Sequence, residues 1–114
     1  MNSRAQFLKG CTRTLVLKVL SERPMYGYEI ASVLAERSKS IFELGQGTLY
    51  PLLYSLERKN LIRVSRQGHN ENGGRKRLYY ELTPKGRNVL QEDVATWVNI
   101  EQGMKLVLGE ATYA

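Results

Sequence analysis

The order of sequence patterns between residues 47 and 87 is the strongest constraint on the fold. Residues 47–59 repeat apolar positions at helical spacing. Leu61–Gln67 and Lys76–Leu82 then alternate apolar and polar side chains, which is typical of two strands joined by a Gly- and Asn-rich tip. Thr83 and Pro84 follow as an N-cap and a proline at the first helical position. The segment therefore predicts a helix, a β-hairpin and a helix from Pro84 to about Leu108.

Two further helices precede this segment. Residues 4–21 carry apolar side chains at helical spacing, and a second helix starts near Gly27 and fades near residues 38–40. Pro51 lacks an N–H, so the third helix cannot begin much earlier than Gln46. The prediction is a mainly α protein with a small β-hairpin: a winged helix-turn-helix domain over residues 1–83, followed by a C-terminal dimerisation helix over residues 84–114.

The composition restricts the setting in which the chain works. Its 114 residues suffice for a single hydrophobic core. No apolar run approaches the ~20 residues of a membrane span, and the N-terminus lacks the apolar segment of a signal peptide. The single cysteine, Cys11, cannot form an intramolecular disulfide, which fits a reducing compartment. We therefore expect a cytoplasmic protein without membrane contact.

The positive charge of the chain is concentrated in one segment. Between Arg58 and Arg87 there are nine Lys and Arg residues against two acids, Glu71 and Glu81, a local charge of +7. The other residues carry eight bases and nine acids, so they add −1 to give the net charge of +6. A basic excess confined to a helix end and a hairpin is typical of a surface that binds a polyanion. Nucleic acid is the first partner to consider.

A helical wheel divides the third helix into an apolar stripe of leucines and an outward face. Tyr50, Tyr54 and Arg58 form a row on that face, and tyrosine hydroxyls can donate to phosphate or base-edge acceptors. Gly47 leaves the helix N-terminus open to phosphate. The alternative is that the tyrosines are ordinary half-buried packing residues. The residues predicted to face double-stranded DNA are Gln46, Gly47, Thr48, Tyr50, Pro51, Tyr54, Ser55 and Arg58.

The hairpin tip adds three consecutive bases, Arg75, Lys76 and Arg77. Arg75 and Arg77 share one face of an alternating strand, so they can straddle a phosphate ridge or enter a minor groove. The alternative is a solvated turn with scattered charge. No second His or Cys lies at ligand spacing from His69, so we expect no metal site there.

Three stretches resemble the PadR family of transcriptional regulators: LKVLSERPMYGYEI, GQGTLYPLLYSLERKNLI and GGRKRLYYELTPKGR. The resemblance covers about residues 8–108 and is closest to the short members with one terminal helix. It implies a dimeric winged-helix repressor whose affinity for DNA falls when a small molecule binds. It also implies that the GTLYP helix enters the major groove through Thr48 and Tyr50, that Tyr26 or Tyr28 touches the DNA backbone, and that residues 75–77 are the bases of the wing. The chain departs from the family at Gly45-Gln46, where members commonly carry a Ser or Asn cap.

The last helix carries a heptad-like apolar seam, interrupted at Glu101 and wider than one small domain could cover. The seam predicts a homodimer, in which the first helix is the expected partner surface, and a palindromic operator with half-sites about one DNA turn apart. Trp97 and Glu101 could line a cavity at the dimer centre and hold a planar aromatic cation as effector. Alternatively, Trp97 only fills the interface and Glu101 reaches solvent. The candidate ligand-binding residues are Phe7, Cys11, Val94, Trp97 and Glu101.

Two other classes of function compete with a ligand-responsive repressor. One is a winged-helix module whose basic face docks an acidic protein partner. The other is an enzyme, which the sequence disfavours because its one His and one Cys lie far apart and no phosphate-binding glycine loop is present. We therefore expect neither a catalytic residue nor a cofactor.

Overall fold

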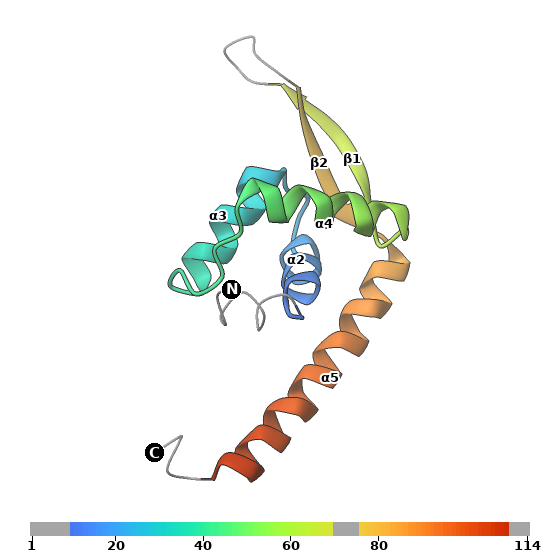
Figure 1. Ribbon diagram of the computed structural model, residues 1–114. Coiled ribbons are helices and arrows are strands. Elements are labelled where there is room, and N and C mark those ends of the chain that lie inside the picture. The colour runs from blue at the N-terminus through green and yellow to red at the C-terminus, as the bar shows by residue number, and fades with distance from the viewer. Residues whose placement is uncertain (1–9, 70–75, 110–114) are drawn as a thin grey trace.

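The computed structural model describes residues 10–69 and 76–109 and confirms the mainly α fold with one hairpin (Figure 1). Its elements are α2 (Thr12–Leu20), α3 (Gly27–Arg37), α4 (Gln46–Arg58), β1 (Ile62–His69), β2 (Lys76–Leu82) and α5 (Pro84–Leu108). The predicted first helix is shorter than expected within the described residues, because residues 10 and 11 form a turn before α2. None of the described helices is long and apolar enough to cross a membrane.

The sequence signals at the helix starts act as expected. Thr83 caps α5: its hydroxyl oxygen accepts a hydrogen bond from the Gly86 N–H at 2.9 Å and donates one to the Asn60 carbonyl at 2.6 Å. Pro84 follows at the first helical position. By contrast, α4 begins after Gly45 without a side-chain cap, and Pro51 lies inside its second turn. The two prolines therefore mark the N-terminal parts of the two helices, as predicted.

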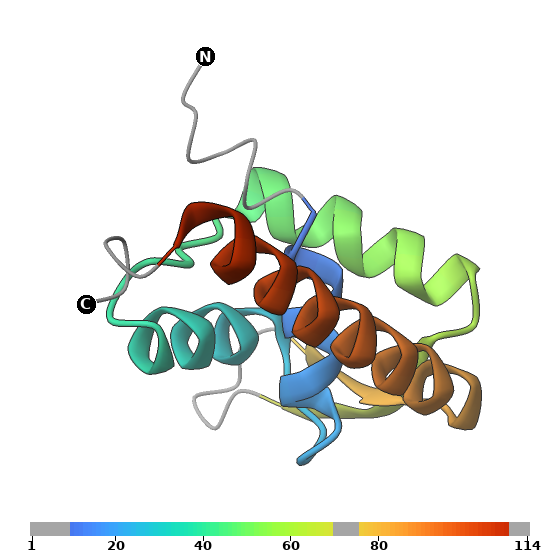
Figure 2. The same cartoon turned by 90° about the horizontal axis from the view of Figure 1, so that it is seen from below.

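The core lies between α2, α3, α4 and the inner half of the hairpin. All four parts contribute side chains that are almost fully buried, among them Leu17, Ile30, Leu53 and Ile62. The last helix adds Leu90 as its only member of this cluster. Figure 2 shows α5 crossing over α2, and Figure 1 shows its C-terminal part running away from the body. Most of α5 therefore lies outside the core.

The pairing of the two strands is interrupted half-way along the hairpin. Ile62 pairs with Leu82 and Val64 with Tyr80, but Arg66 pairs with Tyr79, so Ser65 is an extra residue in β1. Such a bulge bends a strand and increases its twist. On the side of the bulge nearer the core, Ile62, Tyr80 and Leu82 are buried. Val64, next to the bulge, and Leu78, beyond it, are exposed. The predicted alternation is correct for Ile62, Tyr80 and Leu82 but not for Val64 next to the bulge, and the outer half of the hairpin projects from the core (Figure 1).

The junction between α4, the hairpin and α5 is tight at Gly86. A Cβ atom there would collide with the Leu61 carbonyl oxygen and lie 2.9 Å from the Leu82 side chain. Gly86→Ala should therefore lower the free energy of unfolding by roughly 2–4 kcal/mol, because backbone must move. Urea unfolding measures this loss. Gly47→Ala is the control, since its Cβ would meet nothing within 4 Å, and it should leave stability unchanged or slightly raised. Equal unfolding midpoints for the two variants would contradict the tight junction.

Candidate nucleic-acid interface and adjoining pocket

The N-terminal half of α4 presents an open polar surface. Gln46, Gly47, Thr48 and Pro51 are all exposed, and the Gly45 carbonyl accepts hydrogen bonds from the Thr48 and Leu49 N–H groups. An exposed helix start with N–H groups near its end suits contact with phosphate or base edges. These four residues are therefore accessible from solvent.

The tyrosine row on α4 does not behave as a single unit. Tyr54 is 51% exposed, and its ring centroid lies 6.3 Å from that of Tyr50. Tyr50 is half-buried and packs against the core. Its hydroxyl covers Gly27, where an added Cβ would lie only 2.6 Å from the oxygen. The structure thus separates the predicted row: Tyr54 faces solvent, whereas Tyr50 packs on the start of α3.

Two other predicted α4 residues differ in exposure. Ser55 is half-buried, and Arg58 is exposed at the C-terminal end of the helix. Within the part of the chain that the structure describes, Arg58 has no ion pair. Its guanidinium is therefore available to a polyanion, whereas the neighbouring hairpin base Arg63 is paired with Glu81 at 2.7 Å. Hydrogen bonds from Arg63 and Ser65 lower the pKa of Glu81.

The wing is attached to the start of α3. Met25 and Tyr80 exchange backbone hydrogen bonds of 3.1 and 2.9 Å. The Tyr26 and Tyr79 rings meet edge to face with centroids 5.4 Å apart, and the Arg77 guanidinium carbon lies 4.5 Å above the Tyr26 ring. These contacts orient Arg77 beside α3, a neighbour that the strand pattern alone did not indicate.

The remaining residues predicted around the wing are placed as follows. Tyr28 is 71% exposed in the first turn of α3, as a backbone-contacting residue would be. Lys76 begins β2 and pairs with His69. Arg75 lies outside the described residues.

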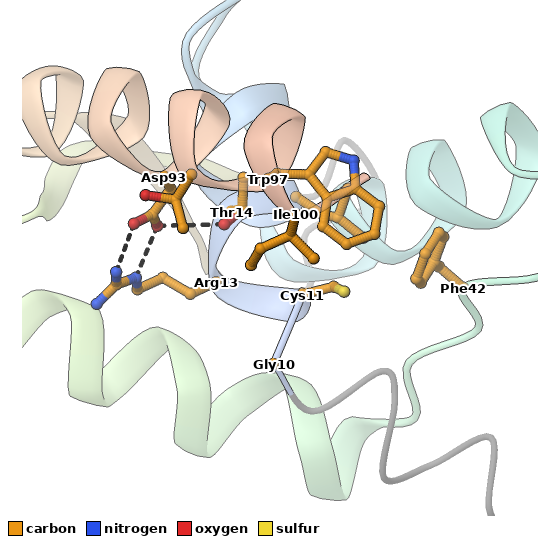
Figure 3. Close-up of a pocket in the computed structure, with 10 residues that line it drawn as sticks. Gly10, Cys11, Arg13, Thr14, Phe42, Asp93, Trp97 and Ile100 are labelled. Carbon is orange, nitrogen blue, oxygen red and sulfur yellow. Dashed lines mark hydrogen bonds and ion pairs between the residues drawn. The ribbon is translucent and has the colours of Figure 1, made fainter. Parts of the chain in front are cut away.

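A pocket of about 410 Å³ lies where α2 meets α5 (Figure 3). Of the predicted ligand residues, Cys11 and Trp97 line it, and Trp97 is 50% exposed. Val94 and Glu101 do not line it: Glu101 pairs with Lys105 at 3.2 Å along α5. Phe7 lies outside the described residues. The pocket is lined by Gly10, Cys11, Arg13, Thr14, Leu15, Phe42, Asp93, Thr96, Trp97 and Ile100.

The acid of this pocket is Asp93, which the sequence analysis did not single out. Figure 3 shows its carboxylate turned toward Arg13 and Thr14, with the Trp97 ring further along the pocket. Asp93 stands one turn before Trp97, just as Glu101 stands one turn after it. The helical spacing could have suggested either acid, and only the packing of α5 on α2 decides between them. No group of three or more His, Cys, Asp or Glu residues that could hold a metal occurs among the described residues.

The arrangement of α3, α4 and wing agrees with comparisons of the whole chain. A sequence model described as the transcriptional regulator PadR-like family matches residues 16–92. The chain belongs to this PadR-like family. Membership confirms the resemblance of the three motifs and implies that the protein regulates transcription by binding DNA. The matched family is described as one of transcriptional regulators.

Individual relatives support the assignment over nearly the full length. An uncharacterised protein of Lysinibacillus sphaericus is 30% identical over 105 residues, which are 92% of this chain and 94% of that one. A transcriptional regulator of Mycobacterium tuberculosis is 34% identical over 88 residues, 77% of each chain. The structure of a PadR-like transcriptional regulator from Bacillus cereus is similar with a TM-score of 0.78 at 30% identity, covering 92% of this chain and 99% of that one.

Proposed function

We propose that this PadR-like regulator is a homodimeric repressor that binds a palindromic operator and releases it when a planar aromatic cation enters the pocket between α2 and α5. The observation that carries the proposal is the uncovered apolar surface of α5. Eight apolar side chains from Val94 to Leu108 are 42–86% exposed in the single chain. Soluble monomers rarely expose so many large apolar side chains on one helix. A second copy would cover it, and residues 84–114 would then form the dimerisation segment.

The dimer sets how the protein meets DNA. Two-fold symmetry would present two α4 helices to successive major grooves, about 34–36 Å apart. Gln46 and Thr48 would reach base edges, and Arg58 and the bases of the wing would contact phosphate. A dimer seated over two half-sites would block a promoter that overlaps them, which is how such a repressor would act.

The pocket supplies the features that an aromatic cation needs. Trp97 offers a ring on which a planar molecule can stack, and Asp93, whose charge is shared with Arg13, is the carboxylate of the pocket wall. In this proposal Asp93, rather than the predicted Glu101, is the acid beside the effector. Since Trp97 is half exposed, the partner's α5 would complete the walls of the site.

One titration series tests the DNA and effector parts together. The protein should bind a duplex carrying its own promoter at least about a thousandfold more tightly than a scrambled duplex at the same salt concentration. In the absence of DNA, planar aromatic cations should quench the fluorescence of Trp97, the only tryptophan of the chain. A cation that quenches, and that leaves free duplex unchanged, should then lower the affinity for the promoter. Equal affinity for the two duplexes would refute the operator. No quenching across a broad panel would refute the effector.

A further inference from the structure

The last helix is joined to the winged-helix body at two places. The first is its N-terminus, where the Thr83 hydroxyl donates to the Asn60 and Leu61 carbonyls and Leu90 packs in the core. The second is nearer its middle, where Asp93 faces Arg13 and Thr14 of α2 (Figure 3). Beyond the pocket the helix extends away from the body (Figure 1), and Leu106 and Val107 are almost fully exposed. The second place therefore lies nearer to the free part of α5 than the first.

Asp93 receives three hydrogen bonds from α2. Arg13 donates from Nη2 to Oδ1 at 2.6 Å and from Nε to Oδ2 at 2.9 Å, and the Thr14 hydroxyl donates to Oδ2 at 3.1 Å. A two-pronged arginine–carboxylate contact restricts rotation as well as distance. The Asp93 side chain is only 16% exposed, so solvent screens it less than an open surface pair. The hydrogen bond to Asp93 raises the pKa of Arg13.

This ion pair differs from the others in what it connects. Glu101–Lys105 lies within α5, and Arg63–Glu81 lies within the hairpin. Of the ion pairs among residues 10–69 and 76–109, Arg13–Asp93 is the one that joins α5 to another element. It therefore links two parts of the molecule that are distant in the sequence.

We propose that Asp93 is a positioning residue for DNA recognition: through Arg13 and Thr14 it fixes the angle at which α5 crosses α2, and thereby the distance between the two α4 helices of the dimer. The inference rests on the proposed dimer, in which α5 is the shared support of both winged-helix bodies. A rotation of about 10° over a lever of about 20 Å moves α4 by roughly 3.5 Å, the rise of one base pair. A small loosening at Asp93 would thus change which half-site spacing the dimer accepts.

The test compares spacing preference in three variants. The operator is first selected by the wild-type protein from random duplexes, and its centre is then lengthened and shortened by one and two base pairs. For the wild type we expect a two-base-pair change to weaken binding on the order of 100-fold. Asp93→Asn and Arg13→Gln should each reduce this penalty to about tenfold. The double variant should be no worse than either single variant, because the same Arg13–Asp93 ion pair is lost in all three.

Glu101→Gln is the matched control, since it removes one carboxylate from the same helix but only an intrahelical pair. It should keep the full spacing penalty. Arg13 is 45% exposed, so Arg13→Gln remains informative if Asp93→Asn fails to fold. A wild-type spacing penalty in Asp93→Asn or in Arg13→Gln would overturn the positioning role while leaving the repressor intact. A wild-type protein that sediments as a monomer, or that shows no operator preference, would overturn both proposals.

Discussion

Replacing Val94 and Met104 by Glu should convert the dimer into a monomer and abolish operator binding. Both side chains lie on the apolar seam of α5, neither lines the pocket, and both are more than 40% exposed in the single chain. Each protomer should therefore still fold. In the dimer the two carboxylates would be buried against apolar partners, a cost of several kcal/mol that should raise the dimer dissociation constant by about a hundredfold or more. Operator affinity should fall at least as far, because each monomer reaches one half-site only.

The control for this experiment adds the same charge to another side of the same helix. Asn99→Glu with Gln102→Glu introduces two carboxylates at exposed polar positions of α5. Repulsion from DNA is then similar in the two double variants, and only the seam differs. Sedimentation velocity gives the oligomeric state, and fluorescence anisotropy with a labelled operator gives the affinity. A Val94/Met104 variant that remains dimeric would show that α5 does not form the interface through this seam.

Replacing Gln46 and Thr48 by Ala should remove most of the sequence preference without affecting the fold. Both residues are exposed in the first turn of α4. Loss of a base contact costs about 1–3 kcal/mol, so the ratio of operator to scrambled-duplex affinity should fall between about tenfold for one contact and several hundredfold or more for two. Binding to the scrambled duplex should change little, because it depends on contacts to phosphate.

Two exposed residues elsewhere make a chemically matched control. Ser32→Ala with Gln91→Ala also removes one hydroxyl and one amide, from α3 and α5. This pair should leave both affinities unchanged. If Gln46→Ala/Thr48→Ala lowers binding to the two duplexes equally, the first turn of α4 contacts the backbone only, and base recognition lies elsewhere.

The elements were predictable wherever a local signal determined them. Thr83 and Pro84 combine a cap with a residue that suits only the helix start, and α5 begins at the predicted position. Pro51 limits α4 in the same way. The inner hairpin followed from alternation, because one face must pack on the core. The Ser65 bulge was missed, since neither glycine nor a break in polarity marks it and its partner strand lies more than ten residues away.

The site residues were harder to predict because packing between distant segments decides them. The wheel placed Tyr50 on the outward face, but Gly27 leaves a space on α3 that the Tyr50 ring fills. Helical spacing relates Trp97 equally to Asp93 and Glu101, and only the crossing of α5 over α2 selects Asp93 for the pocket. The pattern of residues within one segment cannot show which side chains of a distant segment will pack against it. Motif resemblance, by contrast, identified the family, because it depends on residue identities in order along the chain.

Because α5 contributes so little to the core of one chain, the stability of the fold should depend on the concentration of the protein. Leu90 is the only side chain of this 25-residue helix in the buried cluster. If the rest of its apolar row is covered only by a second copy, folding and assembly share one equilibrium governed by mass action. Newly made regulator at low copy number would then be less stable than the same chain at high copy number. Subunits would thus be degraded quickly while the protein is scarce, and slowly once it has accumulated as dimers.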